Sequence, residues 1–481
     1  MIQNAFYSKA KVDNARLIRP TLPRSRTRPD QAPDVTLINL NLMLARQDGT
    51  FDQQCYIPLG PLSIAAVLER HGYCVEFIDY QVFSHARYFD AEMFLDAVGD
   101  LPSVVGISCM SNLLPFAVLV ARTIKQRHAG VFVVLGGVGP SPVARELVAA
   151  FDFIDCVVEG EGELPMLDIL RGKRDRLPQA HIVKDLDELP VPAYSHIDFS
   201  IYDAAPSIVT SRGCPYDCTF CTEPYNFAHT VRFRDVKAVI DEIAIVHGMS
   251  GRTMFLFQDD ILPIKPSRFR RLLDGLTTLP LPIQWKCFSR TDLMNEALMR
   301  QMAAAGCVQI RYGIESGSNR TLRAIRKGFE IEAAYRVAAQ SVEHFPSVHC
   351  SFMWGFPFET AEDVEETLAW LARFEAAGVT CLLFQYSPLP GSPIYRSSNQ
   401  RPLLFDRSKY SIFVLSGHEN IRQLEFEPAA DSDELYDVVS RHPEVFSGFY
   451  HYDDALVADM RNLVQGYEIR HRTPLRNEYD L

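Results

Sequence analysis

The 481-residue sequence lacks the features that define several common protein classes. It has no apolar run long enough to cross a membrane and no apolar segment at its N-terminus, so we expect a cytoplasmic protein without a membrane span. It also lacks an excess of positive charge, because 60 acidic residues outnumber 48 lysines and arginines. The net charge of −12 argues against nonspecific nucleic-acid binding.

A disulfide framework is missing too, although the sequence contains 11 cysteines. Eight of them are scattered through the chain, mostly in apolar segments, and this distribution is typical of small buried side chains in a reducing compartment. These eight are Cys55, Cys74, Cys109, Cys156, Cys287, Cys307, Cys350 and Cys381.

The other three cysteines, Cys214, Cys218 and Cys221, follow an apolar segment at C-x3-C-x2-C spacing. Three thiolates on one short loop can hold three irons of a [4Fe-4S] cluster, whereas the usual cluster has four cysteine ligands. The fourth iron is then open to a small molecule, as reductive cleavage of S-adenosylmethionine (SAM) requires. The alternative is a zinc site, which usually needs a fourth cysteine or histidine at close spacing, and the nearest candidate, His229, stands alone.

This loop resembles the cluster loop of the radical SAM superfamily, in which the aromatic residue before the third cysteine, here Phe220, packs beside the cofactor. Six strand–helix units follow between residues 207 and 395, and this pattern favours a partial (β/α) barrel. The resemblance implies the same six-unit barrel, with its chemistry at the C-terminal ends of the strands.

Candidate SAM contacts follow the predicted second and third strands of this barrel. Asp259 and Asp260 could hold the amino group of SAM or touch the substrate, and their alternative role is helix capping. Arg290 could bind the SAM carboxylate through two hydrogen bonds, and its alternative is a surface ion pair.

Further candidates follow the fourth and fifth strands. The resemblance places Glu315 and Ser316 beside the ribose of SAM, although a serine here could simply cap a helix. Gly355 and Phe356 belong to a Gly-x-Pro-x-Glu-Thr segment that lies on the adenine side in the family.

In the N-terminal half, short β-branched runs alternate with amphipathic helices, which indicates a doubly wound, Rossmann-like parallel sheet. Ligands of such sheets bind at the carboxyl ends of the strands. This half resembles the cobalamin-binding domain that precedes many radical SAM cores. The resemblance predicts cobalamin contacts at Gly60, Ser108, Met110, Gly136, Gly137, Ser141, Gly160 and Glu161.

The predicted cobalamin domain departs from many of its relatives at the axial ligand. They carry a histidine in an Asp-x-His-x-x-Gly motif after the first strand, but no histidine occurs here between Asn39 and Gly60. We therefore expect cobalamin to bind without a histidine lower ligand, with its lower face against residues in the range 42–47. The alternative is a domain that has lost the cofactor and serves as a scaffold.

The predicted fold class is therefore α/β, with a small, mostly helical C-terminal domain after the barrel. The basic, proline-rich N-terminal arm should pack loosely on an acidic surface, and the connector should be a surface linker. An aromatic segment at 447–454 could cap the open side of the barrel or simply pack against it. The predicted divisions are 1–33 (arm), 34–171 (cobalamin domain), 172–206 (linker), 207–395 (radical SAM core) and 396–481 (C-terminal domain).

These features predict a cobalamin-dependent radical SAM enzyme that forms a 5′-deoxyadenosyl radical and methylates an unactivated carbon. We expect a small-molecule or peptide substrate, no nucleic-acid partner, and an external electron donor such as flavodoxin or ferredoxin. One alternative is a rearrangement, cyclisation or oxidation with cobalamin auxiliary or absent. A second is a non-catalytic cobalamin or redox sensor, although no DNA-binding signature accompanies it. A methylthiotransferase is disfavoured, since the first domain has no second cysteine cluster.

Overall fold

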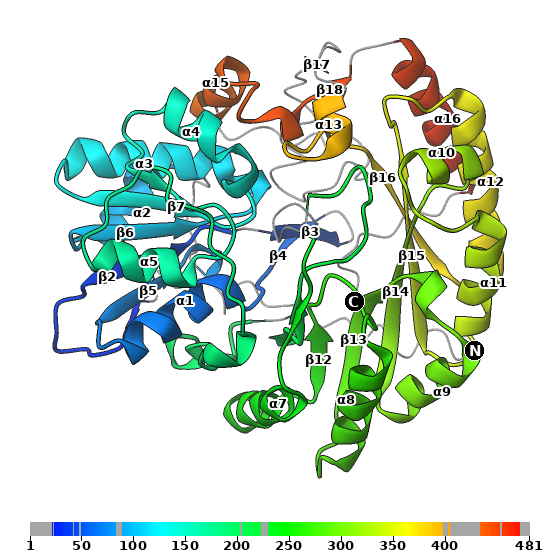
Figure 1. Ribbon diagram of the computed structural model, residues 1–481. Helices are drawn as coiled ribbons and strands as arrows, with labels where there is room; N and C mark the ends of the chain where they lie inside the picture. The colour runs from blue at the N-terminus through cyan, green and yellow to red at the C-terminus, as the bar shows by residue number, and fades with distance from the viewer. Residues whose placement is uncertain are drawn as a thin grey trace.

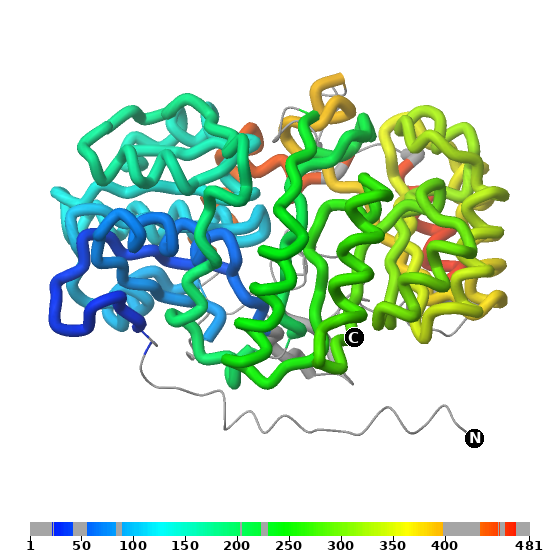
Figure 2. Tube along the Cα trace, turned by 60° about the horizontal axis from the view of Figure 1, so that its bottom comes forward, coloured from blue at the N-terminus to red at the C-terminus, as the bar shows by residue number. Residues whose placement is uncertain are grey.

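The computed structural model contains two α/β units that lie side by side (Figures 1 and 2). The N-terminal unit is coloured blue to cyan in Figure 1, and the second unit is green to yellow. The structure describes residues 22, 24–41, 43–47, 50–82, 89–202, 204–222, 229–397, 403–404, 433–452 and 455–471.

The N-terminal sheet has the strand order β1-β5-β2-β6-β7-β8, in which all strands except β1 pair in parallel. The connection reverses direction between β2 and β6, so the topological switch point lies there. The strands are β1 (Arg24–Arg26), β2 (Val35–Asn39), β5 (Val75–Asp79), β6 (Val104–Ser108), β7 (Phe132–Gly136) and β8 (Cys156–Val157).

Helices cover both faces of this sheet, as its nearly continuous apolar strands require. Buried side chains of α1 (Leu59–Arg70) and α5 (Glu163–Leu170) join one apolar core. Those of α2 (Ala91–Val98), α3 (Leu114–Arg127) and α4 (Ala144–Ala150) join a second core on the opposite face. The predicted doubly wound architecture is thus confirmed.

The second unit is a six-stranded parallel sheet in the order β16-β15-β14-β13-β12-β9, with helices on its outer side. Its strands are β9 (Ser207–Ile208), β12 (Met254–Phe257), β13 (Gln284–Ser289), β14 (Cys307–Glu315), β15 (Ser347–Trp354) and β16 (Thr380–Gln385). Its helices are α7 (Val236–Ser250), α8 (Pro266–Thr278), α9 (Glu296–Ala304), α10 (Asn319–Ala324), α11 (Ile331–Ser341), α12 (Ala361–Ala376) and α13 (Pro393–Ser397).

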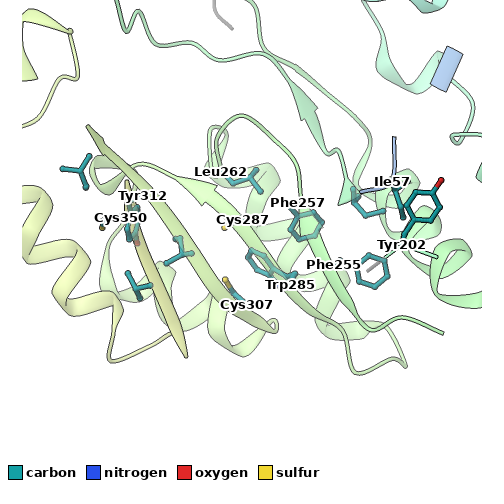
Figure 3. Packing of buried hydrophobic residues seen from close by; sticks show 14 of the residues in the cluster. Ile57, Tyr202, Phe255, Phe257, Leu262, Trp285, Cys287, Cys307, Tyr312 and Cys350 are labelled. Carbon is teal, nitrogen blue, oxygen red and sulfur yellow. The ribbon is translucent and has the colours of Figure 1, made fainter. Parts of the chain in front are cut away.

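Burial alternates along β12 and β13, because one face packs on the helices and the other faces the barrel interior. Trp285 and Tyr312 belong to the helix-side core, shown close up in Figure 3. Trp285 contacts Phe269 of α8, and Tyr312 hydrogen-bonds to Ser341 of α11. The strands are consecutive along the chain, which is the partial (β/α)6 barrel that the sequence predicts.

Short elements complete the described fold, and no described helix is both long and apolar enough to cross a membrane. The two-residue and hairpin strands are β3 (Met43–Gln47), β4 (Thr50–Gln54), β10 (Ser211–Arg212), β11 (Arg232–Phe233), β17 (Leu403–Leu404) and β18 (His451–Tyr452). The 3-10 turns are η2 (Tyr80–Val82), η3 (Ser111–Leu113), η4 (Ser141–Val143), η5 (Leu186–Glu188), η6 (Tyr194–His196), η7 (Thr291–Leu293) and η9 (Ser447–Phe449).

The described end of the N-terminal arm differs from the loosely packed segment that we predicted. Residues 24–26 form strand β1, which pairs antiparallel with β5 at the edge of the sheet. Arg24 and Arg26 both form ion pairs with Glu76, whose side chain is completely buried. A buried carboxylate needs a cationic partner, and this need fixes the basic residues in an ordered strand.

The prediction of a surface linker at 172–206 was wrong for its second half. Tyr194, Phe199 and Tyr202 are buried there and join the apolar core that extends from α1 to the barrel. Figure 3 shows Tyr202 and Ile57 of the N-terminal side in the same core as Phe255 of the barrel. The prolines and charges of this segment obscured its aromatic residues, and these residues bind the two units together.

The two described C-terminal helices pack on different units. Helix α15 (Asp433–Arg441) contacts α3 of the N-terminal unit, whereas α16 (Ala455–His471) contacts α12 of the barrel. Between them, Ser447 donates a hydrogen bond to the carbonyl of Pro388, and Tyr452 stacks on Tyr386. The aromatic segment thus packs at the end of the sixth barrel strand and bridges the two units.

Candidate functional site

A cavity of about 520 Å³ lies where the carboxyl edge of the N-terminal sheet faces the barrel. Its lining comes from both units, and Ser108 and Gly136 at the ends of β6 and β7 lie across from Ser211 and Asp260. This position coincides with the switch point of the sheet, where open α/β sheets bind their ligands.

All eight residues that the sequence predicts as cobalamin contacts line this one cavity, although they come from four separate segments. Two glycines nearby explain how the loops approach each other. Gly137 has φ of +97°, and a Cβ on Gly139 would lie 2.6 Å from the carbonyl carbon of Met110. A side chain at either position would therefore strain or displace the backbone that forms the cavity wall.

The inner part of the cavity is apolar and extends between the sheet and helices α1 and α5. It is lined there by Leu37, Ile64, Val134 and Met166. Gly106 also lines this part of the cavity. A Cβ at this position would crowd the side chains of Leu37, at 3.0 Å, and Met166, at 3.2 Å. A large, partly apolar pocket with a polar mouth fits a bulky corrinoid.

The three cysteines of the candidate cluster site lie on the loop after β10. Cys218 is buried, whereas Cys214 and Cys221 are partly exposed, and none of them forms a disulfide. Burial raises the pKa of Cys214. As they stand, no three or more described His, Cys, Asp or Glu side chains could hold a single metal ion. The donor set of three thiols on one loop fits three irons of a [4Fe-4S] cluster.

Arg290, the predicted partner of the SAM carboxylate, lies beside this loop. Its guanidinium is 3.8 Å from the centre of the Tyr216 ring, and its Nη1 atom is 3.9 Å from Sγ of Cys218. It also donates two hydrogen bonds to Asp292, at 2.9 and 3.0 Å. The side chain is only 5% exposed, so a carboxylate ligand would share or replace the bond to Asp292.

The two predicted aspartates after β12 have different surroundings. Asp259 is buried and accepts hydrogen bonds from the backbone N–H and hydroxyl of Thr210 and from the hydroxyl of Ser211. Asp260 lines the cavity and accepts one bond from the Gly213 N–H at 3.1 Å. Burial and the neighbouring charge of Asp259 raise the pKa of Asp260 to about 6. Asp260 is therefore the better placed of the two to meet a ligand.

The residues predicted beside the ribose are already engaged within the protein. Glu315, at φ of +76°, forms a 3.0 Å ion pair with Lys327. Ser316 is fully buried, and its hydroxyl lies 3.1 Å from that of Thr367. Ser316 therefore supports the backbone of the loop, and Glu315 is the residue of this pair that could reach a hydroxyl.

The predicted adenine-side segment is a tight turn built around Glu359. The carboxylate of Glu359 accepts hydrogen bonds from the N–H groups of Gly355 and Phe356, at 2.6 and 3.2 Å. Its other oxygen, Oε1, is buried and has no hydrogen-bond partner among the described residues, and burial raises the pKa of Glu359 to about 8. The ring of Phe356 lies 6.0 Å from that of Phe220 on the cluster loop, so the two predicted aromatic contacts are brought together.

An ion-pair network that the sequence did not predict connects the cavity wall to the cluster loop. Arg212, two residues before Cys214, bonds to Glu161 at 2.7 Å and to Glu163 at 2.8 Å. Glu161 also pairs with Arg232 at 2.8 Å. Burial would raise the pKa of Glu161, but its pairs with Arg232 and Arg212 outweigh this effect and hold the pKa below its usual value. The carboxylate of Glu161 therefore holds the two units together, whatever it contributes to a ligand.

The remaining cysteines of the N-terminal unit are buried at separate places in its cores. Cys55, Cys74, Cys109 and Cys156 are each at most 1% exposed. Burial raises the pKa of Cys109 well above its ordinary value and that of Cys156 to about 12. This arrangement supports their interpretation as buried hydrophobic residues rather than as ligands of a second cluster.

Comparison with known protein families identifies both units. Residues 208–371 match the radical SAM superfamily, and residues 52–170 match the B12 binding domain. An uncharacterised methyltransferase of Pyrococcus horikoshii is 29% identical over 337 residues, which cover 64% of this chain and 72% of that protein. The cytidylyl-2-hydroxyethylphosphonate methyltransferase of Streptomyces wedmorensis is 29% identical over 441 residues, covering 75% of this chain and 81% of that protein.

The fold is shared with solved structures over most of the chain. The radical S-adenosylmethionine methyltransferase TsrM of Kitasatospora setae superposes with a TM-score of 0.62 at 18% identity, covering 90% of this chain and 89% of that one. The cobalamin-dependent radical enzyme OxsB has the same TM-score and covers 90% of this chain and 66% of that one. The chain therefore contains a B12 binding domain followed by a domain of the radical SAM superfamily.

Proposed function

We propose that this enzyme uses SAM and cobalamin together to methylate an unactivated carbon of its substrate. The observation that carries the proposal is the interdomain cavity, which is lined both by the predicted cobalamin contacts and by Ser211, Arg212 and Asp260 around the cluster loop. One cavity between the two domains would place a methyl donor and a radical generator on the same substrate.

In this proposal the cofactors would supply the chemistry: a cluster would provide the electron for reductive cleavage of SAM, and cobalamin would provide the methyl group. The chain binds and orients them. Cys214, Cys218 and Cys221 would hold three irons, and the buried guanidinium of Arg290 would meet the SAM carboxylate. Asp260, with its raised pKa, would accept a hydrogen bond from the SAM amino group at the cavity wall.

Several similar proteins are named as methyltransferases, which supports methyl transfer. Besides the phosphonate methyltransferase, a bacteriochlorophyllide d C-12(1)-methyltransferase of Chlorobaculum tepidum is 25% identical over 68% of this chain. An anaerobic magnesium-protoporphyrin IX monomethyl ester cyclase of Rubrivivax gelatinosus is 24% identical over 64% of this chain. That cyclase keeps a non-methylating reaction as the second candidate.

We further propose that the cobalt has no histidine lower ligand. The described residues that line the cavity include no histidine. The lower-face range 42–47 forms β3 from Met43 onward, in a hairpin with β4, but Leu42 and the side chains of both strands lie outside the described residues. The electron paramagnetic resonance spectrum of bound cob(II)alamin tests this point, because a nitrogen ligand would add its characteristic hyperfine splitting.

The decisive experiment uses the full chain, purified without oxygen and loaded with iron, sulfide and hydroxocobalamin. We expect S-adenosylhomocysteine from the methylation of bound cobalamin after reduction, and 5′-deoxyadenosine in addition when substrate is present. 5′-Deoxyadenosine without S-adenosylhomocysteine or a methylated product would instead support the rearranging, cyclising or oxidising alternative. A reduced, fully loaded enzyme that makes no 5′-deoxyadenosine with candidate substrates would contradict the radical mechanism.

A further inference from the structure

A short stretch beside the cluster loop has a charge opposite to that of the whole chain. Residues 316–329 contain Arg320, Arg323, Arg326 and Lys327 and no acidic residue, whereas the chain carries a net charge of −12. The three arginines recur at every third position through α10 and the turn after it. This spacing places Arg320 and Arg323 on one side of the helix, and Arg326 lies two residues past its end with φ of +57°.

The arginines of this stretch face solvent, and Lys327 does not. The side chains of Arg320, Arg323 and Arg326 are 50%, 65% and 62% exposed, whereas the Lys327 side chain is 6% exposed and pairs with Glu315. We call the three exposed residues the arginine patch.

The intramolecular ion pairs of the patch leave it available to a partner. Arg323 pairs with Glu330 and Arg326 with Asp217, and both acids are about half exposed. Exposed ion pairs of this kind typically contribute less than about 1 kcal/mol, so an acidic partner can compete for the same guanidinium groups. Arg320 differs, because its partner Asp363 is 6% exposed and caps helix α12.

The patch touches the loop that carries the cysteines. Asp217, which pairs with Arg326, immediately precedes Cys218 in the chain. Thr219, which follows Cys218, donates its N–H to the carbonyl of Ile325 at 3.1 Å. The exposed arginines therefore lie next to the backbone on both sides of a candidate cluster ligand.

We propose that the arginine patch is the docking surface for an acidic one-electron carrier protein that reduces the cluster. The inference depends on the proposed function only in assuming that a reducible cluster occupies the cysteine loop. In the step itself the carrier is oxidised by one electron and the cluster is reduced by one electron, with no bond made or broken. Charge complementarity would speed the encounter and align the carrier with the nearest edge of the cluster.

Nucleic acid is the other anionic partner that arginines attract, and the structure favours the carrier protein. Three exposed cations could neutralise about three phosphates, which gives only weak, salt-dependent binding to nucleic acid. A docking surface for electron transfer, by contrast, has to lie close to the cluster, and this patch does.

The test compares the Arg323→Glu variant with wild type, using the full chain with a reconstituted cluster and flavodoxin as the carrier. We expect flavodoxin to bind the variant about tenfold more weakly at low ionic strength, and to reduce its cluster correspondingly more slowly. The control is Arg300→Glu on α9, because Arg300 is 59% exposed and also forms a surface ion pair, with Glu296. Dithionite, a small reductant that needs no docking surface, should reduce both variants and wild type at equal rates.

Three results would overturn the proposal: equal flavodoxin affinity for wild type and Arg323→Glu, an equal loss in Arg300→Glu, or an affinity that does not weaken as salt increases. A variant that lost affinity for transfer RNA but not for flavodoxin would assign the patch to nucleic acid instead. Binding and cluster reduction are both measured without substrate or methyl transfer. A failure of the methyltransferase proposal is therefore distinguishable from a failure of this one.

Discussion

Glu359 offers a quantitative test of the turn on the predicted adenine side. Its carboxyl group is completely buried, and burial raises its pKa to about 8 from an ordinary value near 4.5. Between these two values the folded protein binds more protons than the unfolded chain, so the free energy of unfolding falls as the pH rises. Each pH unit in this window corresponds to about 1.36 kcal/mol, and the interval from pH 5 to pH 8 therefore removes about 4 kcal/mol.

The Glu359→Gln variant cannot ionise, but its amide oxygen can still accept the hydrogen bonds from Gly355 and Phe356. Relative to wild type, we expect it to gain thermal stability as the pH rises from 5 to 8, by roughly 8 °C at roughly 2 °C per kcal/mol. The measurement is the unfolding temperature of both proteins across this pH range. The control is Glu362→Gln, because Glu362 is exposed and hydrogen-bonded and its pKa is lowered. A constant difference between Glu359→Gln and wild type from pH 5 to pH 8 would refute the reasoning.

Three further changes probe the rest of the site. Cys214→Ser should lower the iron content and the visible cluster absorbance of protein purified without oxygen. The control variant Cys156→Ala should leave both unchanged. Equal iron content in the two variants would contradict the cluster assignment. Gly139→Ala should reduce corrinoid retention after incubation with hydroxocobalamin, because its Cβ would meet the Met110 backbone at 2.6 Å. Gly130→Ala should bind normally, because a Cβ there would have no described atom within 4 Å apart from its chain neighbours. Arg212→Met should lower the free energy of unfolding by about 3 kcal/mol, because it leaves the buried carboxylate of Glu163 without its cation. Adding Glu163→Gln should recover part of this loss, and a purely additive double variant would show that the pair does not interact.

The ion pairs of Arg212 connect the two units and resist their displacement relative to each other. Arg212 lies between the cavity wall at Glu161 and the cluster loop that begins at Gly213. A displacement of either unit would have to break buried ion pairs, which is costly in a low-dielectric environment. The network therefore favours a fixed distance between the two predicted cofactor sites.

The sequence alone determined the order and type of the two units and the cysteine loop. The periodic apolar segments needed no long-range information, because strands buried on both faces and amphipathic helices are recognisable locally. The spacing of Cys214, Cys218 and Cys221 is likewise a property of one short segment, and the glycines at the strand ends were recognisable by their place in the pattern. The resemblance of these segments to cobalamin-binding domains implied the eight cobalamin contacts, and the structure brings all of these residues to one cavity.

Only the tertiary structure decided what the charged residues of these motifs contact. Glu161 pairs with Arg212 and Arg232, which lie 51 and 71 residues away along the chain, and no local pattern encodes such partners. The same holds for Asp259, whose oxygens are occupied by Thr210 and Ser211, and for the connector that proved to be buried. The physical reason is that apolar periodicity depends only on residues close together in the chain. The partner of a buried charge depends instead on how segments far apart in the chain pack together.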